Sequence, residues 1–275
     1  TQSRSSAASD VYKRQALTRC SEAAIADGDS RVHGCFTYQS TIFEQLSGIR
    51  QHSLVASLEA LNTSMSNSLV VLEGLSANAL ANYSKQHDID FVHATESFDP
   101  NGILEQQQVA KALETIGKKL VLEGSNYAVT PGKVVKPTDG SAYRVYTPFY
   151  KAWFEIGWSQ PFTLPPKMSW AQGVQTKVPT PTNPAQFKVR AGEAFALETF
   201  DRFKKRALFD YSDNRNRADL SGTSKLSHAL AHGEIHPRTL LADLRDTPGH
   251  NVFRKEIAWR EFYADVLFRN PHTLT

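Results

Sequence analysis

Short apolar runs alternate with amphipathic stretches in the first half of the chain. The apolar runs have the length of buried strands and fall at residues 32–36, 69–74, 91–97 and 120–124. Between them, leucines recur at helical spacing, as Leu54, Leu58 and Leu61 do. Strands that alternate with helices form parallel, doubly wound sheets. We therefore expect an α/β domain with a Rossmann-like parallel sheet over residues 16–150.

Two details of this region bear on its fold and chemistry. Val109, Leu113 and Ile116 repeat the helical spacing, and Ser76 is a candidate N-cap for a helix that runs to about His87. No GxGxxG or GxxxxGK[ST] motif follows any of the predicted strands. A nucleotide bound on such a glycine loop is therefore not supported.

The pattern changes after the stretch YTPFYKAWFEIGW. Residues 161–184 hold six of the thirteen prolines, which predicts an extended interdomain linker over residues 151–185. From residue 186 to the end, helical patterns rich in Phe, Arg and Lys predict an all-α part, 186–275. The first fifteen residues are Ser-rich without apolar periodicity, so we treat residues 1–15 as a foreign or disordered tail.

The composition is that of a soluble globular protein. Of the 275 residues, 40% are hydrophobic and 21% are charged, and no apolar run approaches the roughly 20 residues of a membrane span. Two cysteines, Cys20 and Cys35, make no disulfide framework and suit a reducing cytoplasm. The net charge of +3 resides in residues 186–275, which hold 15 Lys and Arg against 12 Asp and Glu. This bias is compatible with a polyanionic partner.

The stretch FRKEIAWREFY (253–263) predicts a helix with an unusual arrangement of charges. At about 100° per residue, its apolar arc consists of Phe253, Ile257, Ala264 and Leu267. Glu256 and Arg260 fall inside this arc, one helical turn apart. A second group of charged residues is expected to form the opposite, solvated face: Arg254, Glu261 and Asp265.

Two interpretations of Glu256 and Arg260 are open at this point. An exposed Glu–Arg pair four residues apart is common on helices and stabilises them by about 0.2–0.5 kcal/mol. Alternatively, the two side chains line a pocket, because charges are seldom fully buried unless they are paired or used. In that case they meet a polar ligand, and Trp259 offers a flat aromatic face beside them.

The stretch SGTSKLS (221–227) suggests an anion site. Thr223 and Ser224 precede a helix that is predicted to begin near Leu226. Hydroxyl groups and free N–H groups at the start of a helix favour phosphate. Tyr211 lies twelve residues before Thr223 and is a candidate to close over the same site. The alternative is an ordinary Ser/Thr N-cap.

His228, His232 and His236 have the spacing of one helix face, which invites a metal-site interpretation. Gly233 and Pro237 are expected to end the helix before the third histidine. No HExxH motif supports such a site either, so we predict no metal.

Four motifs resemble the photolyase/cryptochrome family. YRVYTPFYKAW (143–153) is followed, in the family's order, by GTSKLS (222–227), GEIHPRT (233–239) and EIAWREFYADVL (256–267). The nearest resemblance is to bacterial class I cyclobutane pyrimidine dimer photolyases, and it extends over residues 16–275. It implies an α/β antenna-binding domain followed by a partial all-α FAD-binding domain.

The resemblance also implies cofactors, a partner and site residues. FAD is the implied cofactor, with a second antenna chromophore of the folate or deazaflavin type, and UV-damaged DNA is the implied partner. Glu256 would hydrogen-bond the damaged pyrimidines, and Trp259 would stack on the flipped-out dimer, as catalytic and DNA-binding residues. The residues implied in FAD binding are Tyr211, Thr223, Ser224, Lys225, Leu226, Ser227, Phe253, Glu256 and Arg260.

Departures from the family pattern affect these expectations. Lys225 stands where many relatives have arginine, which replaces a bidentate fork by a point charge. Phe253 stands where relatives often have tryptophan. The family's opening WFRRDLR-type strand is absent, and the chain stops after the WREFY helix. We therefore expect a fragment that, on its own, neither retains FAD nor repairs DNA.

Three functions follow as alternatives. The parent protein is expected to repair cyclobutane pyrimidine dimers in DNA with light, by electron transfer from reduced FAD. A cryptochrome-type blue-light receptor would share the flavin pocket, but Trp259 beside Glu256 favours repair. A non-catalytic nucleic-acid-binding module would explain the basic helical part but not Glu256 and Arg260. In each case we expect a monomeric, cytoplasmic protein.

Overall fold

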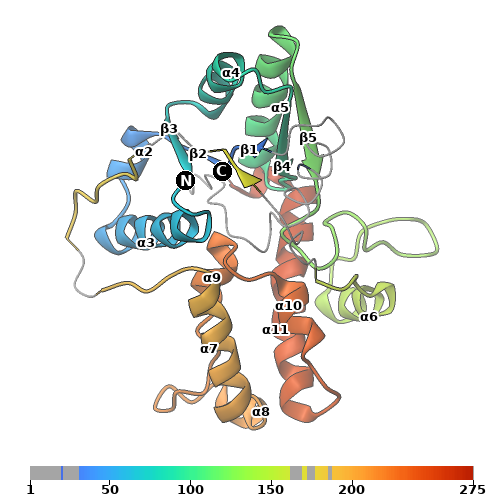
Figure 1. Ribbon diagram of the computed structural model, residues 1–275. Coiled ribbons are helices and arrows are strands. Elements are labelled where there is room, and N and C mark those ends of the chain that lie inside the picture. Colours follow the sequence, from blue (N-terminus) through green and yellow to red (C-terminus); the bar gives the residue numbers. More distant parts are fainter. Residues whose placement is uncertain (1–19, 21–30, 162–168, 172–176, 185–187, 275) are drawn as a thin grey trace.

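The strands and the C-terminal helices occupy different ends of the molecule (Figure 1). The computed structural model describes residues 20, 31–161, 169–171, 177–184 and 188–274. The predicted tail, 1–15, lies outside the described residues. The α/β part fills the upper half of Figure 1, and most of the later helices extend below it.

Six short strands in the described residues form three parallel pairs. Arg31–Val32 (β1) pairs with Ser169–Trp170 (β6), Cys35–Tyr38 (β2) with Val70–Glu73 (β3), and Phe91–Thr95 (β4) with Lys119–Glu123 (β5). Parallel pairing and intervening helices confirm the α/β class. The apolar run 32–36 belongs to two strands, β1 and β2, instead of one. A side chain at Gly34, between them, would collide with the end of the Met65 side chain, which packs against the backbone at this point.

Helices connect the strands of the α/β part in the expected order. They are Ser40–Glu44 (α2), Gly48–Ser64 (α3), Ser76–Gln86 (α4) and Pro100–Thr115 (α5). Leu54, Leu58 and Leu61 of α3 share a buried cluster with Phe36 and Val71 of the strands. The apolar stripe predicted for this helix is therefore confirmed.

Ser76 does not cap α4 as predicted. The N-cap is Leu75, and Ser76 is the first helical residue. The hydroxyl of Ser76 lies 2.7 Å from Thr37 Oγ1 and donates to the carboxylate of Glu105. The hydroxyl bonds to these two side chains and not to a backbone amide of α4, so Ser76 links β2 to α5.

The described parts of the predicted linker pack on their surroundings. The helix Tyr146–Ile156 (α6) reaches into it, and β6 joins β1. The amides of Thr182 and Asn183 each donate to the side-chain oxygen of the buried Gln51, at 2.9 Å. The domain boundaries themselves stay predictions.

The described residues from Glu193 onward are mainly helical. The helices are Glu193–Arg206 (α7), Tyr211–Asn214 (α8), Ser227–His232 (α9), Pro237–Ala242 (α10), Pro248–Arg269 (α11) and a final 3-10 turn, Pro271–Leu274 (η1). Gly233 ends α9 in the left-handed conformation, at φ 74°, and Pro237 begins α10. The predicted break between His232 and His236 is thus confirmed. None of the helices in the described residues is both long and apolar enough to span a membrane.

Helix α6 belongs to the core of the helical part. Its Phe149 and Trp153 are fully buried together with Phe200 of α7 and with Phe253 and Ile257 of α11. The family-like motif that ends in Trp153 therefore supplies part of the wall against which α11 packs.

Helix α11 does not have the solvated face that the sequence predicts. Arg254, Glu261 and Asp265 were expected in solvent, but all three are buried, and each carboxylate residue is only 2% exposed. Ala264 and Leu267, expected in the core, are half-buried. A helical-wheel prediction assumes one covered side, whereas α11 contacts the helical core on one side and the loop after β5 on another.

Candidate functional site

Glu256 lies where α11 faces α8. Its carboxylate Oε1 pairs with the guanidinium of Arg215, just after α8, and 36% of the glutamate side chain is exposed. The ion partner of Glu256 is thus Arg215, which replaces the surface pair with Arg260 considered from the sequence. A carboxylate has about four lone-pair positions, so Glu256 keeps acceptor capacity for a ligand.

Trp259 lies one turn further along α11, against α6. Its ring stacks on Tyr146 with a centroid distance of 3.6 Å and an angle of 7°. The Tyr146 hydroxyl donates to the Lys255 carbonyl oxygen at 2.8 Å, which fixes that ring. Tyr263, 63% exposed, lies 5.6 Å from Trp259. Tyr146 covers one indole face and Tyr263 also stacks against the ring, so a base could stack only on the part of the indole that these two rings leave uncovered.

Arg260 reaches the loop after β5. Its Nη1 donates to the Asn126 carbonyl oxygen at 3.1 Å, and its guanidinium carbon lies 4.7 Å from the centre of the Tyr127 ring. The structure therefore directs Glu256 and Arg260 towards different segments. A role for Arg260 in FAD binding stays a prediction.

Tyr211, Leu226 and Phe253, all predicted to contact FAD, are buried in the helical core. The rings of Tyr211 and Phe253 meet edge to face at 5.5 Å, and each also contacts Phe203. Burial raises the pKa of the Tyr211 phenol. The structure brings these three residues together, and their packing alone accounts for their apolar character.

The polar residues of the predicted anion site lie at the start of α9. Thr223 and Ser224 are half-buried, and Lys225 and Ser227 are exposed. Lys225 adopts φ 57°, a left-handed conformation that is uncommon for lysine. The N-cap of α9 is Leu226, with no side-chain cap bond, so the alternative of an ordinary Ser/Thr cap is wrong.

The three histidines do not converge. The rings of His228 and His232 lie 4.2 Å apart, but His236 Nε2 contacts the Ser125 carbonyl oxygen at 2.9 Å, and its Nδ1 accepts from the Arg238 amide at 3.0 Å. Burial lowers the pKa of His236 to about 3, so the ring is neutral. In the part of the chain that the structure describes, no His, Cys, Asp and Glu cluster could hold a metal.

The loop of residues 125–132 was missed by the sequence reasoning. Glu261 accepts hydrogen bonds from the amides of Ala128 and Val129, the latter at 3.0 Å, and from Trp153 Nε1 at 2.6 Å. Burial raises the pKa of Glu261, while these three N–H donors oppose that effect by favouring the carboxylate. The carboxylate thus joins the loop, α6 and α11.

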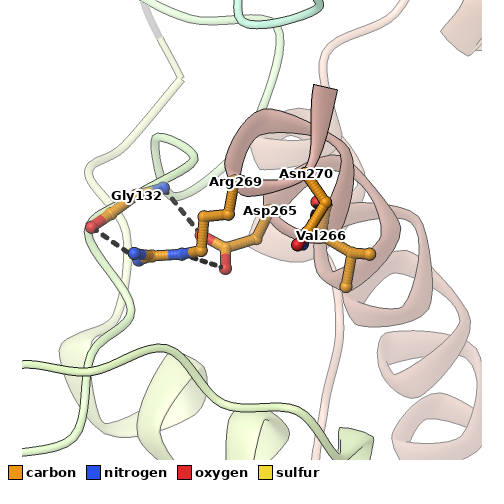
Figure 2. Close-up of polar contacts among 5 residues, drawn as sticks. All are labelled: Gly132, Asp265, Val266, Arg269 and Asn270. Carbon is orange, nitrogen blue, oxygen red and sulfur yellow. Dashed lines mark hydrogen bonds and ion pairs between the residues drawn. The ribbon is translucent and has the colours of Figure 1, made fainter. Parts of the chain in front are cut away.

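A second carboxylate holds the end of the same loop (Figure 2). The Gly132 amide donates to Asp265 at 2.7 Å, Arg269 Nε donates to Asp265 at 2.8 Å, and Arg269 Nη2 donates to the Gly132 carbonyl oxygen at 3.0 Å. The three groups close a ring of hydrogen bonds. The spacing Glu261, Asp265, Arg269 was the available signal, since it repeats a charge every four residues on one helix face.

The fold has two parts. Parallel strands with connecting helices come first, and helices follow that pack around α11 with its charged and aromatic side chains. The DNA photolyase family model matches residues 13–167, more than half of the chain, and the chain belongs to this family. It is similar to a deoxyribodipyrimidine photo-lyase of Agrobacterium fabrum, with 30% identity over 249 residues, 82% of this chain and 51% of that protein.

Two solved structures have a similar fold. A bacterial class III photolyase from Agrobacterium tumefaciens matches with a TM-score of 0.77 and 25% identity, over 98% of this chain and 61% of that one. A Synechocystis cryptochrome matches with a TM-score of 0.80 and 18% identity, over 96% and 61%, and supports the fold alone. The chain spans about half the length of the curated relatives it matches.

Proposed function

We propose that this chain contributes the lesion-contacting helix of an enzyme that splits cyclobutane pyrimidine dimers in DNA with light. The observation that supports it is the position of Glu256 and Trp259, half-buried and one turn apart on α11, in a member of the DNA photolyase family. The helix thus offers a carboxylate acceptor and an aromatic ring side by side to an incoming ligand.

In this proposal each of the two side chains has a separate task. A dimer inside a duplex must be extruded at a cost of a few kcal/mol, as in other enzymes that flip a base out of the stack. Stacking of a base on Trp259 would offset about 1–3 kcal/mol of that cost. The free lone pairs of Glu256 accept from the polar edge of the bases, and the ion pair with Arg215 orients the carboxylate.

FAD is the cofactor of this proposal, and reduced FAD would supply the electron that opens the dimer. The hydroxyls of Thr223 and Ser224 have no hydrogen-bond partner among the described residues, and the neighbouring Lys225 is exposed, so this stretch fits a diphosphate. Tyr211 and Phe253 would border the ring system only if their present contacts opened. A second, antenna chromophore in the α/β part completes the proposal.

Binding of the protein to damaged and undamaged DNA tests this function. Trp259→Ala should weaken binding to dimer-containing DNA by about 1–3 kcal/mol, with little effect on undamaged DNA, where phosphate contacts dominate. Trp170→Ala, in β6, is the matched control and should change neither affinity. An equal loss for both DNA substrates in a gel-shift titration would make Trp259 a core residue and exclude the stacking role.

The flavin assignment has its own measurement. Thr223→Ala combined with Ser224→Ala should lower the FAD content per mole of reoxidised protein and leave the melting temperature nearly unchanged, because neither hydroxyl caps α9. Unchanged flavin content would exclude these residues from the cofactor site. Stoichiometric FAD with no light-dependent dimer splitting would favour the cryptochrome-type receptor instead.

A further inference from the structure

Tyr146, the first residue of α6, makes the closest ring contact of Trp259. The two ring planes differ by 7° and their centroids are 3.6 Å apart, so the faces of the rings lie directly against each other. Stacked aromatic rings attract each other beyond the effect of the buried area alone. An indole in such a contact is restrained whenever its neighbour is itself immobile.

The Tyr146 ring is held on several sides. Its hydroxyl donates to the Lys255 carbonyl oxygen at 2.8 Å, and burial raises the pKa of the phenol, so the hydroxyl keeps its proton. Tyr150 stacks on the same ring at 6.0 Å, and the buried Phe262 meets it edge to face at 5.9 Å. Tyr146 is therefore an immobile neighbour.

The ring and the hydroxyl of Tyr146 act on the same turn of α11. In an α-helix the carbonyl oxygen of one residue faces the amide of the residue four positions later, so the Lys255 carbonyl belongs to the turn that carries Trp259. Tyr146 thus contacts both the backbone of this turn and the indole that projects from it. This double contact defines the orientation of the indole relative to the helix axis.

The two other ring contacts of Trp259 among the described residues restrain it less. Phe262 meets the indole edge to face at a centroid distance of 5.7 Å. Tyr263 stacks on it at 5.6 Å, but 63% of Tyr263 is exposed, so this ring can move into solvent. The orientation of the indole therefore depends mainly on Tyr146.

We propose that Tyr146 is a positioning residue, which holds the Trp259 indole in one orientation before any ligand binds. A ligand ring that stacks on Trp259 then meets a side chain that has already lost its rotamer freedom. Immobilising a free side chain during binding lowers the affinity by about two- to tenfold. Tyr146 would raise the affinity for dimer-containing DNA by this factor, a consequence that rests on the proposed function. The restraint on the indole requires no ligand.

Fluorine NMR of the purified chain labelled with 5-fluorotryptophan measures this restraint without DNA. The chain has four tryptophans, and the signal that is lost in Trp259→Phe belongs to Trp259. In Tyr146→Leu we expect the Trp259 line to narrow at least twofold, because a released indole moves faster than the whole protein. The lines of Trp153 and Trp170 should keep their widths. Tyr146→Phe keeps the stacked ring and should keep the broad Trp259 line.

Tyr143→Leu is the matched control for this measurement. Tyr143 is partly buried against the same helical core, and the described ring contacts of Trp259 do not include it, so the Trp259 line should stay broad. If Tyr146→Leu unfolds the chain, all four lines narrow, and Tyr146→Met, with a flexible side chain that fills the space, takes its place. An unchanged Trp259 line width in the folded variant would overturn the proposal.

A gel-shift titration tests the consequence for binding. Tyr146→Leu should lower the affinity for dimer-containing DNA by about two- to tenfold and leave the affinity for undamaged DNA unchanged. A narrowed Trp259 line with unchanged affinity for dimer-containing DNA would overturn this consequence. Failure of the proposed function gives a different result: Trp259→Ala would then bind dimer-containing DNA as tightly as the unmodified chain does, whatever the width of the Trp259 line.

Discussion

The two sides of α11 use charged residues in different ways. On the side of the 125–132 loop, Glu261 accepts from three N–H groups and Asp265 from the Gly132 amide and Arg269, and both are buried. On the side of α8, Glu256 is 36% exposed and pairs with Arg215 alone among the described residues. One helix thus carries two buried carboxylates that accept several hydrogen bonds and, on another side, a partly exposed carboxylate with a single ion partner.

This difference separates structural from functional charge. A buried charge costs several kcal/mol unless it is hydrogen-bonded, and Glu261 and Asp265 have N–H donors that offset this cost, so they can hold the loop while their burial keeps ligands away. Glu256 keeps free acceptor positions and water access, so it can exchange water for a ligand at little cost. A carboxylate is available for function when it has few hydrogen-bond partners within the protein and is also exposed to water.

The largest expected loss of stability comes from removing Glu261, the buried carboxylate that accepts three hydrogen bonds. Glu261→Ala leaves the amides of Ala128 and Val129 and the indole N–H of Trp153 without their acceptor. An unsatisfied buried donor costs about 1–3 kcal/mol, so the free energy of unfolding in urea should fall by at least about 3 kcal/mol. Glu256→Ala is the matched control and should lose less than about 1 kcal/mol. Equal losses of unfolding free energy in the two variants would contradict the difference proposed between the two sides of α11.

A pH-dependent effect tests how the loop is held by α10. The pKa of His236 is lowered to about 3, from 6.5 in the unfolded chain, so below pH 6.5 only the unfolded chain takes up this proton. Its contribution to stability is therefore complete above pH 6.5 and is lost towards pH 3, by about 1.4 kcal/mol per pH unit.

His236→Asn removes this proton uptake and keeps an acceptor that suits the N-cap of α10. Urea titrations between pH 7 and 4 should show a shallower loss of stability in this variant than in the unmodified chain. His272→Asn, at an exposed position in η1, should keep the original slope. Parallel curves for His236→Asn and the unmodified chain would show that the ring is protonated in the folded state.

The sequence predicted the fold better than it predicted the site. Alternation of apolar runs and helical stripes identified the α/β part, because strands and helices of this kind follow local periodicity. The same periodicity misjudged Arg254, Glu261 and Asp265, since their partners lie on loops and helices more than a hundred residues away or at the start of α11. Periodicity along one helix cannot indicate how many of its sides are covered.

The candidate site shows the same division. Resemblance placed Glu256 and Trp259 on one helix, and the structure puts them at a half-buried position beside Arg215 and Tyr146. Neither neighbour could be predicted from the sequence. Arg215, for example, lies 41 positions from Glu256 and meets it only through the packing of α8 on α11. Contacts of this range depend on tertiary packing, which local patterns do not contain.

An intermediate effect is expected from the ring of hydrogen bonds around Gly132. Asp265→Asn keeps an oxygen acceptor for the Gly132 amide but removes the negative charge next to Arg269 (Figure 2). Charge-assisted bonds are roughly twice as strong as neutral ones, so the free energy of unfolding should fall by about 1–2 kcal/mol. Asp243→Asn, at a surface pair with Lys204, should change it by less than about 1 kcal/mol. If Asp243→Asn lowered the free energy of unfolding more than Asp265→Asn, burial would not explain the strength of these charge-assisted bonds.

The smallest effect on stability is expected for Glu256, the partly exposed carboxylate with a single ion partner. Both members of the Arg215–Glu256 pair are about one-third exposed, and exposed ion pairs contribute about 0.2–1 kcal/mol. A double-mutant cycle with Arg215→Gln and Glu256→Gln should therefore give a coupling energy below about 1 kcal/mol in unfolding titrations. High salt should reduce it further, because water reaches both groups. A salt-independent coupling above about 2 kcal/mol would place Glu256 with Glu261 among the structural carboxylates, and the carboxylate proposed to meet the DNA lesion would have to be sought elsewhere.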